Sequence, residues 1–122
     1  MRGSPLHTTM KKQFRLSADQ IRILVTGYGS CIASDRITVD GTRVGYMYRE
    51  RPRDSADSGW HFFSGDEPQQ YVDDPGNLGI YDVNTIANYD PEITPFLDKP
   101  IDTAWARDST GRFAEDKIDP LE

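Results

Sequence analysis

Adjacent carboxylates beside an aromatic run are the residues of this sequence best suited to catalysis. Asp66 and Glu67 follow the run Trp-His-Phe-Phe at 60–63 and a glycine, which would place both acids at the edge of an aromatic cleft. Two carboxyl groups of unequal pKa can carry out general acid–base hydrolysis of the glycosidase kind. A chain with 20 acidic residues in 122 is expected to contain such pairs by chance, so a solvated loop or a helix cap at Asp66 is favoured. A small hydrolase or ligand-binding domain remains the alternative function.

Histidine and cysteine are too few for other common catalytic or metal sites. The chain has two histidines, His7 and His61, and one cysteine, Cys31. A Ser-His-Asp or Cys-His arrangement and a cysteine-rich zinc site are therefore unsupported, and an internal disulfide is impossible. His61 stands between aromatic residues, where a half-buried structural role is favoured over acid–base chemistry. Cys31, among small apolar residues, is expected to pack. We expect no catalytic residue, no metal and no cofactor.

The charge balance restricts the possible partners. Fourteen basic and 20 acidic residues give a net charge of −6. Phosphate contacts dominate the affinity of proteins for nucleic acid, so we expect no nucleic-acid binding. No stretch approaches the roughly 20 apolar residues of a membrane span, and the N-terminus lacks the apolar run of a secretory signal. We therefore expect a cytoplasmic protein that does not contact membranes. An acidic surface favours a basic protein partner.

The length predicts a single domain. The first residues, Met-Arg-Gly-Ser, and the closing Leu-Glu are typical of expression-vector sequence, whereas Met10 is a second candidate start. We assign residues 1–9 to a tail, residues 10–116 to one domain, and residues 117–122 to a C-terminal tail with a vector-derived end.

Helix signals predict short helical segments. Ser17 and Gln20 form a Ser-x-x-Gln capping box, and the apolar residues of 21–25 follow at helical spacing, which predicts a helix over 17–26. Asp82 is expected to cap a second helix. Asp90-Pro91 repeats the start signal, with aspartate as the N-cap and proline at the first helical position.

Strand signals predict a mainly antiparallel sheet. The dipeptide Asp40-Gly41 predicts a type I′ hairpin that pairs Val39 with Thr42 and Ile37 with Val44. Further strands are expected at 31–34 and 60–64, a helical turn near 69–72, and a final hairpin from 103–107 and 111–115. The predicted fold class is α+β: a single domain with a mainly antiparallel sheet and two or three short helices.

Three motifs resemble a known bacterial family. They are VGYMYRE at 44–50, GWHFFSGDE at 59–67 and GIYDVNTIANYDP at 79–91. Over about residues 10–116 the chain is similar to the immunity protein thirty-three family, first catalogued as bacterial domain of unknown function twenty-one eighty-five. In the family pattern arginine often occupies the position of His61, which argues against a general base there.

The resemblance implies a cytosolic antidote that neutralises a polymorphic toxin by stoichiometric binding, without catalysis. The partner would then be a basic toxin domain that meets an acidic surface. The residues expected at the interface are Asp66, Glu67, Tyr71, Asp73, Asp74, Asn84 and Asn88. For the two asparagines, both a structural role and a contact role stay open. A third possibility is a scaffold whose motifs serve folding alone.

Overall fold

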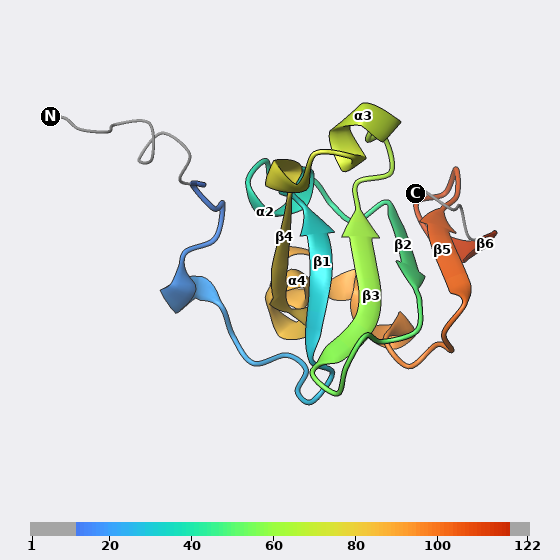
Figure 1. The fold of residues 1–122 in the computed structure, drawn as a ribbon, viewed down its shortest axis with the longest axis horizontal. Coiled ribbons are helices and arrows are strands. Elements are labelled where there is room, and N and C mark those ends of the chain that lie inside the picture. The colour runs from blue at the N-terminus through green and yellow to red at the C-terminus, as the bar shows by residue number, and fades with distance from the viewer. Residues whose placement is uncertain (1–11, 118–122) are drawn as a thin grey trace, which may run out of the picture.

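A six-stranded sheet is the frame of the computed structural model, which describes residues 12–117 (Figure 1). The predicted tail at 1–9 lies outside this range, and so does the predicted tail at 117–122 apart from residue 117. The strands are β1 (Ser30–Ser34), β2 (Tyr46–Arg49), β3 (Asp57–Phe63), β4 (Leu78–Asp82), β5 (Thr103–Arg107) and β6 (Phe113–Asp116). Their order in the sheet is β4-β1-β3-β2-β5-β6. The pair β1–β3 is parallel and the other four pairs are antiparallel, which confirms the predicted α+β class with a mainly antiparallel sheet.

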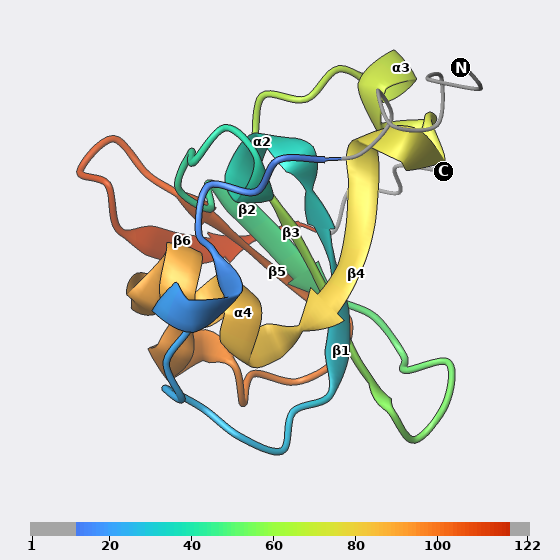
Figure 2. The same cartoon turned by 90° about the vertical axis from the view of Figure 1, so that its left-hand side faces the viewer.

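The helices are short, and α4 lies on one side of the sheet only (Figure 2). They are the α-helices α2 (Asp35–Thr38), α3 (Gln69–Val72) and α4 (Val83–Tyr89), and the 3-10 helices η1 (Ala18–Gln20), η2 (Pro75–Asn77) and η3 (Pro91–Phe96). Within residues 12–117, no helix has the length and apolar character needed to cross a membrane.

The hydrophobic core fills the space between the sheet and the helices α4 and η3. Side chains alternate along a strand, so β3 directs Trp60 and Phe62 into this core, and Met47 of the neighbouring β2 joins them. Helix α4 and η3 contribute Ile86 and Ile93 from the other side. Each large apolar side chain buried in this way stabilises the fold by about 1.5–3 kcal/mol. One face of the sheet is therefore buried in the core.

The hairpin predicted around Asp40-Gly41 is wrong. Ser34 Oγ accepts a hydrogen bond from the backbone N–H of Arg36, at 3.1 Å, and starts helix α2 at this point instead. Gly41 ends the helical turn with a φ of 81°, and its N–H donates to the carbonyl of Ile37 at 3.1 Å. A glycine after a helix and a glycine in a type I′ turn both need a left-handed backbone, so the dipeptide fits either structure.

The helix predicted over 17–26 is also wrong beyond Gln20. The capping box is present, with the N–H of Ser17 donating to Gln20 Oε1 at 2.8 Å, but it supports only the single turn η1. The residues that follow are not helical, because asparagine side chains of α4 bind their backbone groups.

The remaining expected elements are confirmed. Residues 31–34 lie in β1, 60–63 lie in β3, and 69–72 form α3. Asp82 caps α4 by accepting from the N–H of Asn84 at 2.9 Å, and Asp90 caps η3 by accepting from the N–H of Glu92 at 3.1 Å. Strands β5 and β6 form the final hairpin.

A buried ion pair joins η3 to β5. Asp90 is 2% exposed, and its Oδ2 accepts from Arg107 at 2.7 Å and from the N–H of Val44 at 3.0 Å. Arg107 also donates to the carbonyl of Val44 and to Glu92, at 2.8 and 2.7 Å. Because these hydrogen bonds satisfy both charges, removing one partner leaves the other buried and unpaired, which is the costly case.

We expect Asp90→Ala to lower the free energy of unfolding by about 3–5 kcal/mol, measured by urea denaturation. Glu92→Gln is the matched control, because its side chain is 62% exposed and such ion pairs contribute about 1 kcal/mol or less. Equal losses in the two variants would contradict the role assigned to the buried carboxylate.

Candidate functional site

The long connection between β3 and β4, residues 64–77, is called the excursion here. It carries the first predicted interface residues, beginning with Asp66. Its Oδ1 accepts from the Ser64 hydroxyl at 2.5 Å and from Arg36 at 2.8 Å, while its side chain is 73% exposed. The hydrogen bond from Ser64, followed by the contact with Arg36, lowers the pKa of Asp66 below its ordinary value. Asp66 therefore favours the ionised form.

Glu67 closes the same turn through its carboxylate. The backbone N–H groups of Ser64 and Gly65 donate to its two oxygens at 2.8 and 2.9 Å. A hydrolase built on this pair would require one carboxyl group with a raised pKa to act as general acid, and Asp66 is shifted the other way. The contacts of both acids instead stabilise the turn, so the arrangement does not support the hydrolase alternative.

Tyr71, Asp73 and Asp74 lie further along the excursion, on α3 and at the start of η2. The guanidinium of Arg36 lies 4.7 Å from the centre of the Tyr71 ring. Asp73 accepts from the side chain of Gln69 at 2.8 Å, and Asp74 caps η2 by accepting from the N–H of Gly76 at 2.9 Å. Both aspartates are exposed. Five of the seven predicted interface residues thus lie on the excursion, beyond the end of β3 (Figure 1).

The other two predicted residues, Asn84 and Asn88, lie on α4 behind the sheet, apart from the excursion (Figure 1). Asn84 Oδ1 accepts from the N–H groups of Leu24 and Val25 at 2.7 and 3.1 Å. Asn88 Oδ1 accepts from the N–H of Arg22 at 2.9 Å, and both amides donate to the carbonyl of Arg22 at 2.8 Å. These contacts support the structural role, in which α4 holds an irregular segment in place.

We expect Asn84→Ala to release this segment. The N–H groups of Leu24 and Val25 lose their acceptor, so their amide hydrogen exchange should become faster, as measured by NMR or mass spectrometry. Asn84→Asp is the control, because it keeps the oxygen that accepts from Leu24 and Val25, while a carboxylate oxygen replaces the donor to the carbonyl of Arg22. Unchanged exchange in Asn84→Ala would contradict the structural role.

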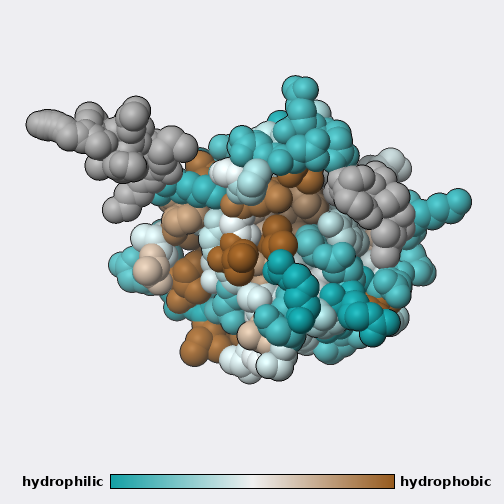
Figure 3. All heavy atoms as spheres, in the orientation of Figure 1, coloured by the Kyte–Doolittle hydropathy of each residue, from teal (hydrophilic) through white to brown (hydrophobic). Residues whose placement is uncertain are grey.

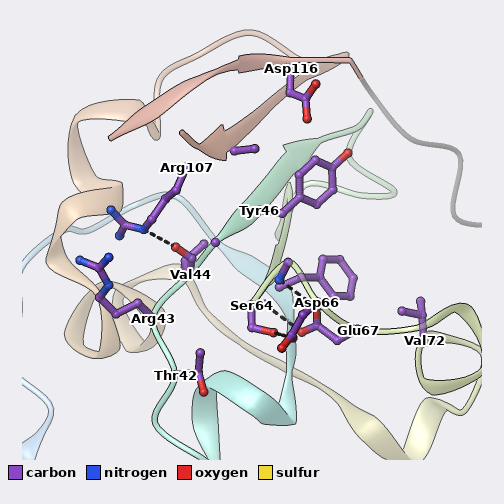
Figure 4. A pocket seen from close by; sticks show the side chains of 14 residues that line it. Thr42, Arg43, Val44, Tyr46, Ser64, Asp66, Glu67, Val72, Arg107 and Asp116 are labelled. Carbon is purple, nitrogen blue, oxygen red and sulfur yellow. Dashed lines mark hydrogen bonds between the residues drawn. The ribbon is translucent and has the colours of Figure 1, made fainter. Parts of the chain in front are cut away.

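A cleft of about 800 Å³ opens beside the excursion (Figure 4). Asp66 and Glu67 line one side, and Arg43 and Arg107 lie across from them. The complete lining is Thr42, Arg43, Val44, Gly45, Tyr46, Phe63, Ser64, Gly65, Asp66, Glu67, Val72, Ala106, Arg107 and Asp116. The sequence predicted Asp66 and Glu67 at the edge of an aromatic cleft, and both line this one; it did not predict the two arginines, because they come from separate segments that only the strand order brings together.

An aromatic patch continues from the cleft across the sheet face that points away from the core. It consists of Tyr46, Tyr48, His61 and Phe63, of which Phe63 is buried. The strand register places Tyr46 opposite Phe63 and Tyr48 opposite His61. The Tyr48 ring stacks on His61 with centroids 4.5 Å apart and lies nearly parallel to Phe63 at 6.2 Å. His61 Nε2 also contacts Glu50 Oε2 at 2.5 Å. The patch is therefore held by stacking and by one carboxylate.

The imidazole of His61 is largely buried, and its surroundings set its protonation. Burial lowers the pKa of His61 below its ordinary value, while the carboxylate of Glu50 acts in the opposite direction and offsets part of the effect. Because the unfolded chain binds the proton first as pH falls below about 6.5, the folded state loses stability in that range.

We expect the unfolding free energy of the native protein, relative to His61→Gln, to decrease as pH is lowered through 6.5 towards the folded pKa of His61. Parallel denaturation curves above and below this pH measure the difference. An NMR titration of the imidazole should show a midpoint below 6.5, and Glu50→Gln should lower it further. A midpoint at or above 6.5 would contradict the dominance of burial.

The comparison with known families covers most of the folded chain. The family model described as Immunity protein Imm33 domain matches residues 31–117. This span runs from β1 to the end of β6 and includes the excursion, the cleft and the aromatic patch, whereas the segment held by Asn84 and Asn88 precedes it. No curated protein and no solved structure matches the chain. The chain belongs to the Imm33 family of immunity proteins.

Proposed function

We propose that this protein neutralises a bacterial toxin domain by binding it stoichiometrically in the cytoplasm, with no catalytic step of its own. Membership of the immunity protein family over residues 31–117 carries the proposal. The contacts of Asp66 and Glu67 support it, because both carboxylates serve the turn rather than a reaction.

The distribution of charge supports a basic partner. Between Arg53 and Lys99 the chain contains ten Asp or Glu residues and no Lys or Arg. This stretch builds β3, the excursion, β4, α4 and η3. Asp73 and Asp74 are exposed on it, and the hydrogen bonds of their side chains come from a neutral amide and a backbone N–H. Their negative charges are thus available to a cationic surface, which speeds encounter and disfavours acidic competitors.

Capture of the partner tests the proposal directly. The full chain, carrying an affinity tag, is used to retain proteins from the lysate of its native bacterium at low and at moderate salt. A basic toxin domain should be retained in equal amount and released as salt rises. Co-expression with that domain should then restore growth of the host. Toxicity that persists despite co-expression, or no retained toxin at either salt concentration, would contradict the proposed function.

We expect Asp73→Lys to weaken binding of the captured toxin about tenfold and to reduce the salt dependence of its association rate. The exposed carboxylate acts through long-range attraction, which salt screens. Asp40→Lys is the control, because it makes the same change of charge on the exposed turn after α2. Calorimetry and stopped-flow association measure the two effects. Equal affinity of the two variants for the toxin would contradict a role of the acidic excursion in binding.

A further inference from the structure

One edge of the sheet carries unpaired backbone groups that can bind another strand. We propose that β4 pairs along this edge with an extended segment of the toxin that bears lysine or arginine, so that the toxin adds a strand to the sheet. This inference rests on the proposed function and names a surface and a partner chemistry for that binding.

Alternate backbone groups of β4 point away from β1, the strand with which it pairs. In an antiparallel pair, every second residue exchanges both of its backbone hydrogen bonds with the residue opposite. The N–H of Val83 donates to the carbonyl of Gly29 at 2.9 Å. By this alternation Tyr81 is bonded to β1, whereas the N–H and the carbonyl of Ile80 point outwards. The N–H of Asp82 points outwards as well.

The first outward groups of β4 already have partners within the chain. The carbonyl of Leu78 accepts from Lys12 Nζ at 2.9 Å, and the N–H of Leu78 donates to the carbonyl of Pro75. Among residues 12–117, no hydrogen bond reaches the outward groups of Ile80 or the N–H of Asp82. The open part of the edge therefore begins at Ile80 and ends where α4 begins.

Side chains do not protect this edge against pairing. Ile80 is 67% exposed, and residues 78–81 contain no charge. The opposite edge strand, β6, ends in exposed Glu115 and Asp116, and charged side chains on an edge discourage pairing with another chain. Figure 2 looks onto the edge of β4, and no other labelled element crosses it there.

An apolar side chain of the partner would find a neighbour on the sheet face that points away from the core. The register places Ile80 beside Ile32 on this face, because the adjacent Cys31 and Ala33 enter the core. Figure 3 shows hydrophobic atoms gathered over β4 and β1 on the same face. A strand paired with β4 would place one side chain about 4.5–5.5 Å from Ile80, measured between Cβ atoms.

Acids at both ends of the open edge favour a cationic segment. Asp82 is exposed at one end, and Asp73 and Asp74 lie on the part of the excursion that leads into the other end. The ammonium group of Lys12 pairs with Asp35 at 2.8 Å, so its charge is balanced within the chain. Lysine or arginine on either side of the paired residue would therefore meet carboxylates.

A second copy of this chain also carries an unpaired β4, and the charges decide against that occupant. Two chains that each have a net charge of −6 repel one another as they approach. A basic segment is attracted by the same charges, and its backbone supplies the same donors and acceptors. The toxin segment is therefore the occupant that we assign to this edge.

Amide hydrogen exchange of the free chain tests whether the edge is open. The full chain, labelled with 15N, is measured by NMR at low and at high protein concentration. The N–H of Ile80 should exchange faster than that of Tyr81, which faces β1. Slow exchange of Ile80 at both concentrations would mean that the chain covers its own edge, and slow exchange only at high concentration would mean that a second copy does. Either result would overturn the proposal.

Defined peptides test the chemistry without the toxin. The labelled chain is titrated with the acetylated amide of Lys-Val-Thr-Val-Lys, with a twin that is N-methylated at alternate residues, and with a twin whose lysines are glutamates. The lysine peptide should shift the amide signals of Ile80 and Asp82 and slow the exchange of Ile80. N-methylation blocks strand pairing, so its twin should not do so. Equal shifts with either twin, or no shifts at these residues, would overturn the proposal.

The captured toxin tests the location. Ile80→Pro should lose at least about tenfold in affinity, because it removes the outward N–H and places a ring against the partner strand. Proline is tolerated on an edge strand where the N–H takes no part in the ladder. Ile80→Thr is the matched control, because it keeps both the N–H and a β-branched side chain, and it should stay within about threefold of the native affinity. A thermal melt of each variant verifies folding.

The native complex provides a readout that needs no variant. Toxin binding should slow the amide exchange of Ile80 and leave that of Tyr81 unchanged. Full affinity in folded Ile80→Pro, or unchanged exchange of Ile80 in the native complex, would overturn this inference alone. Absence of protection by the native chain in co-expression would overturn the proposed function.

Discussion

The carboxylate of Asp90 lies where three segments of the chain meet. It caps η3, accepts from the backbone of Val44 just before β2, and pairs with Arg107 at the end of β5. Tyr46 begins β2 two residues after Val44, and both residues line the cleft. The position of the first aromatic side chain therefore depends on a charge that is buried and fully hydrogen-bonded. Because a half-satisfied buried pair is strongly destabilising, this contact holds η3, the end of β5 and the residues before β2 together.

Among residues 12–117, helix α4 packs against one face of the sheet, and the side chains of β2 and β3 are divided between that face and the opposite one. Along β2 and β3 the residues alternate, so Met47 and Phe62 enter the core while Tyr48 and His61 face outwards. A shift of register by one residue would exchange the two sets, and burial of the apolar set fixes the register against such a shift. The outward residues are thus placed by the packing of their neighbours in the core.

The sequence predicted the elements whose signals are local. Asp82 and Asp90 act as caps through N–H groups two residues away, and β5–β6 is a short hairpin. The grouping of Asp66, Glu67, Tyr71, Asp73 and Asp74 was predictable for the same reason, since these residues are contiguous, while their role in binding stays a prediction. The wrong predictions have causes that are distant in the sequence. Residues 21–25 follow a helical pattern, but Asn84 holds their backbone across about 60 positions. The arginine side of the cleft could not be predicted, because Arg43 and Arg107 face Asp66 and Glu67 only once the strand order is known.

Charge and desolvated contacts would contribute differently to the proposed binding of a toxin. Exposed carboxylates such as Asp73 speed encounter, but single exposed ion pairs add only about 0–1 kcal/mol and weaken with salt. Charge on the excursion alone would give a complex that forms quickly and dissociates quickly. Neutralisation requires the toxin to remain bound, and slow dissociation comes from desolvated anchors. The exposed charges of Asp73 and Asp74 would therefore have to be joined by desolvated contacts for the proposed complex to last.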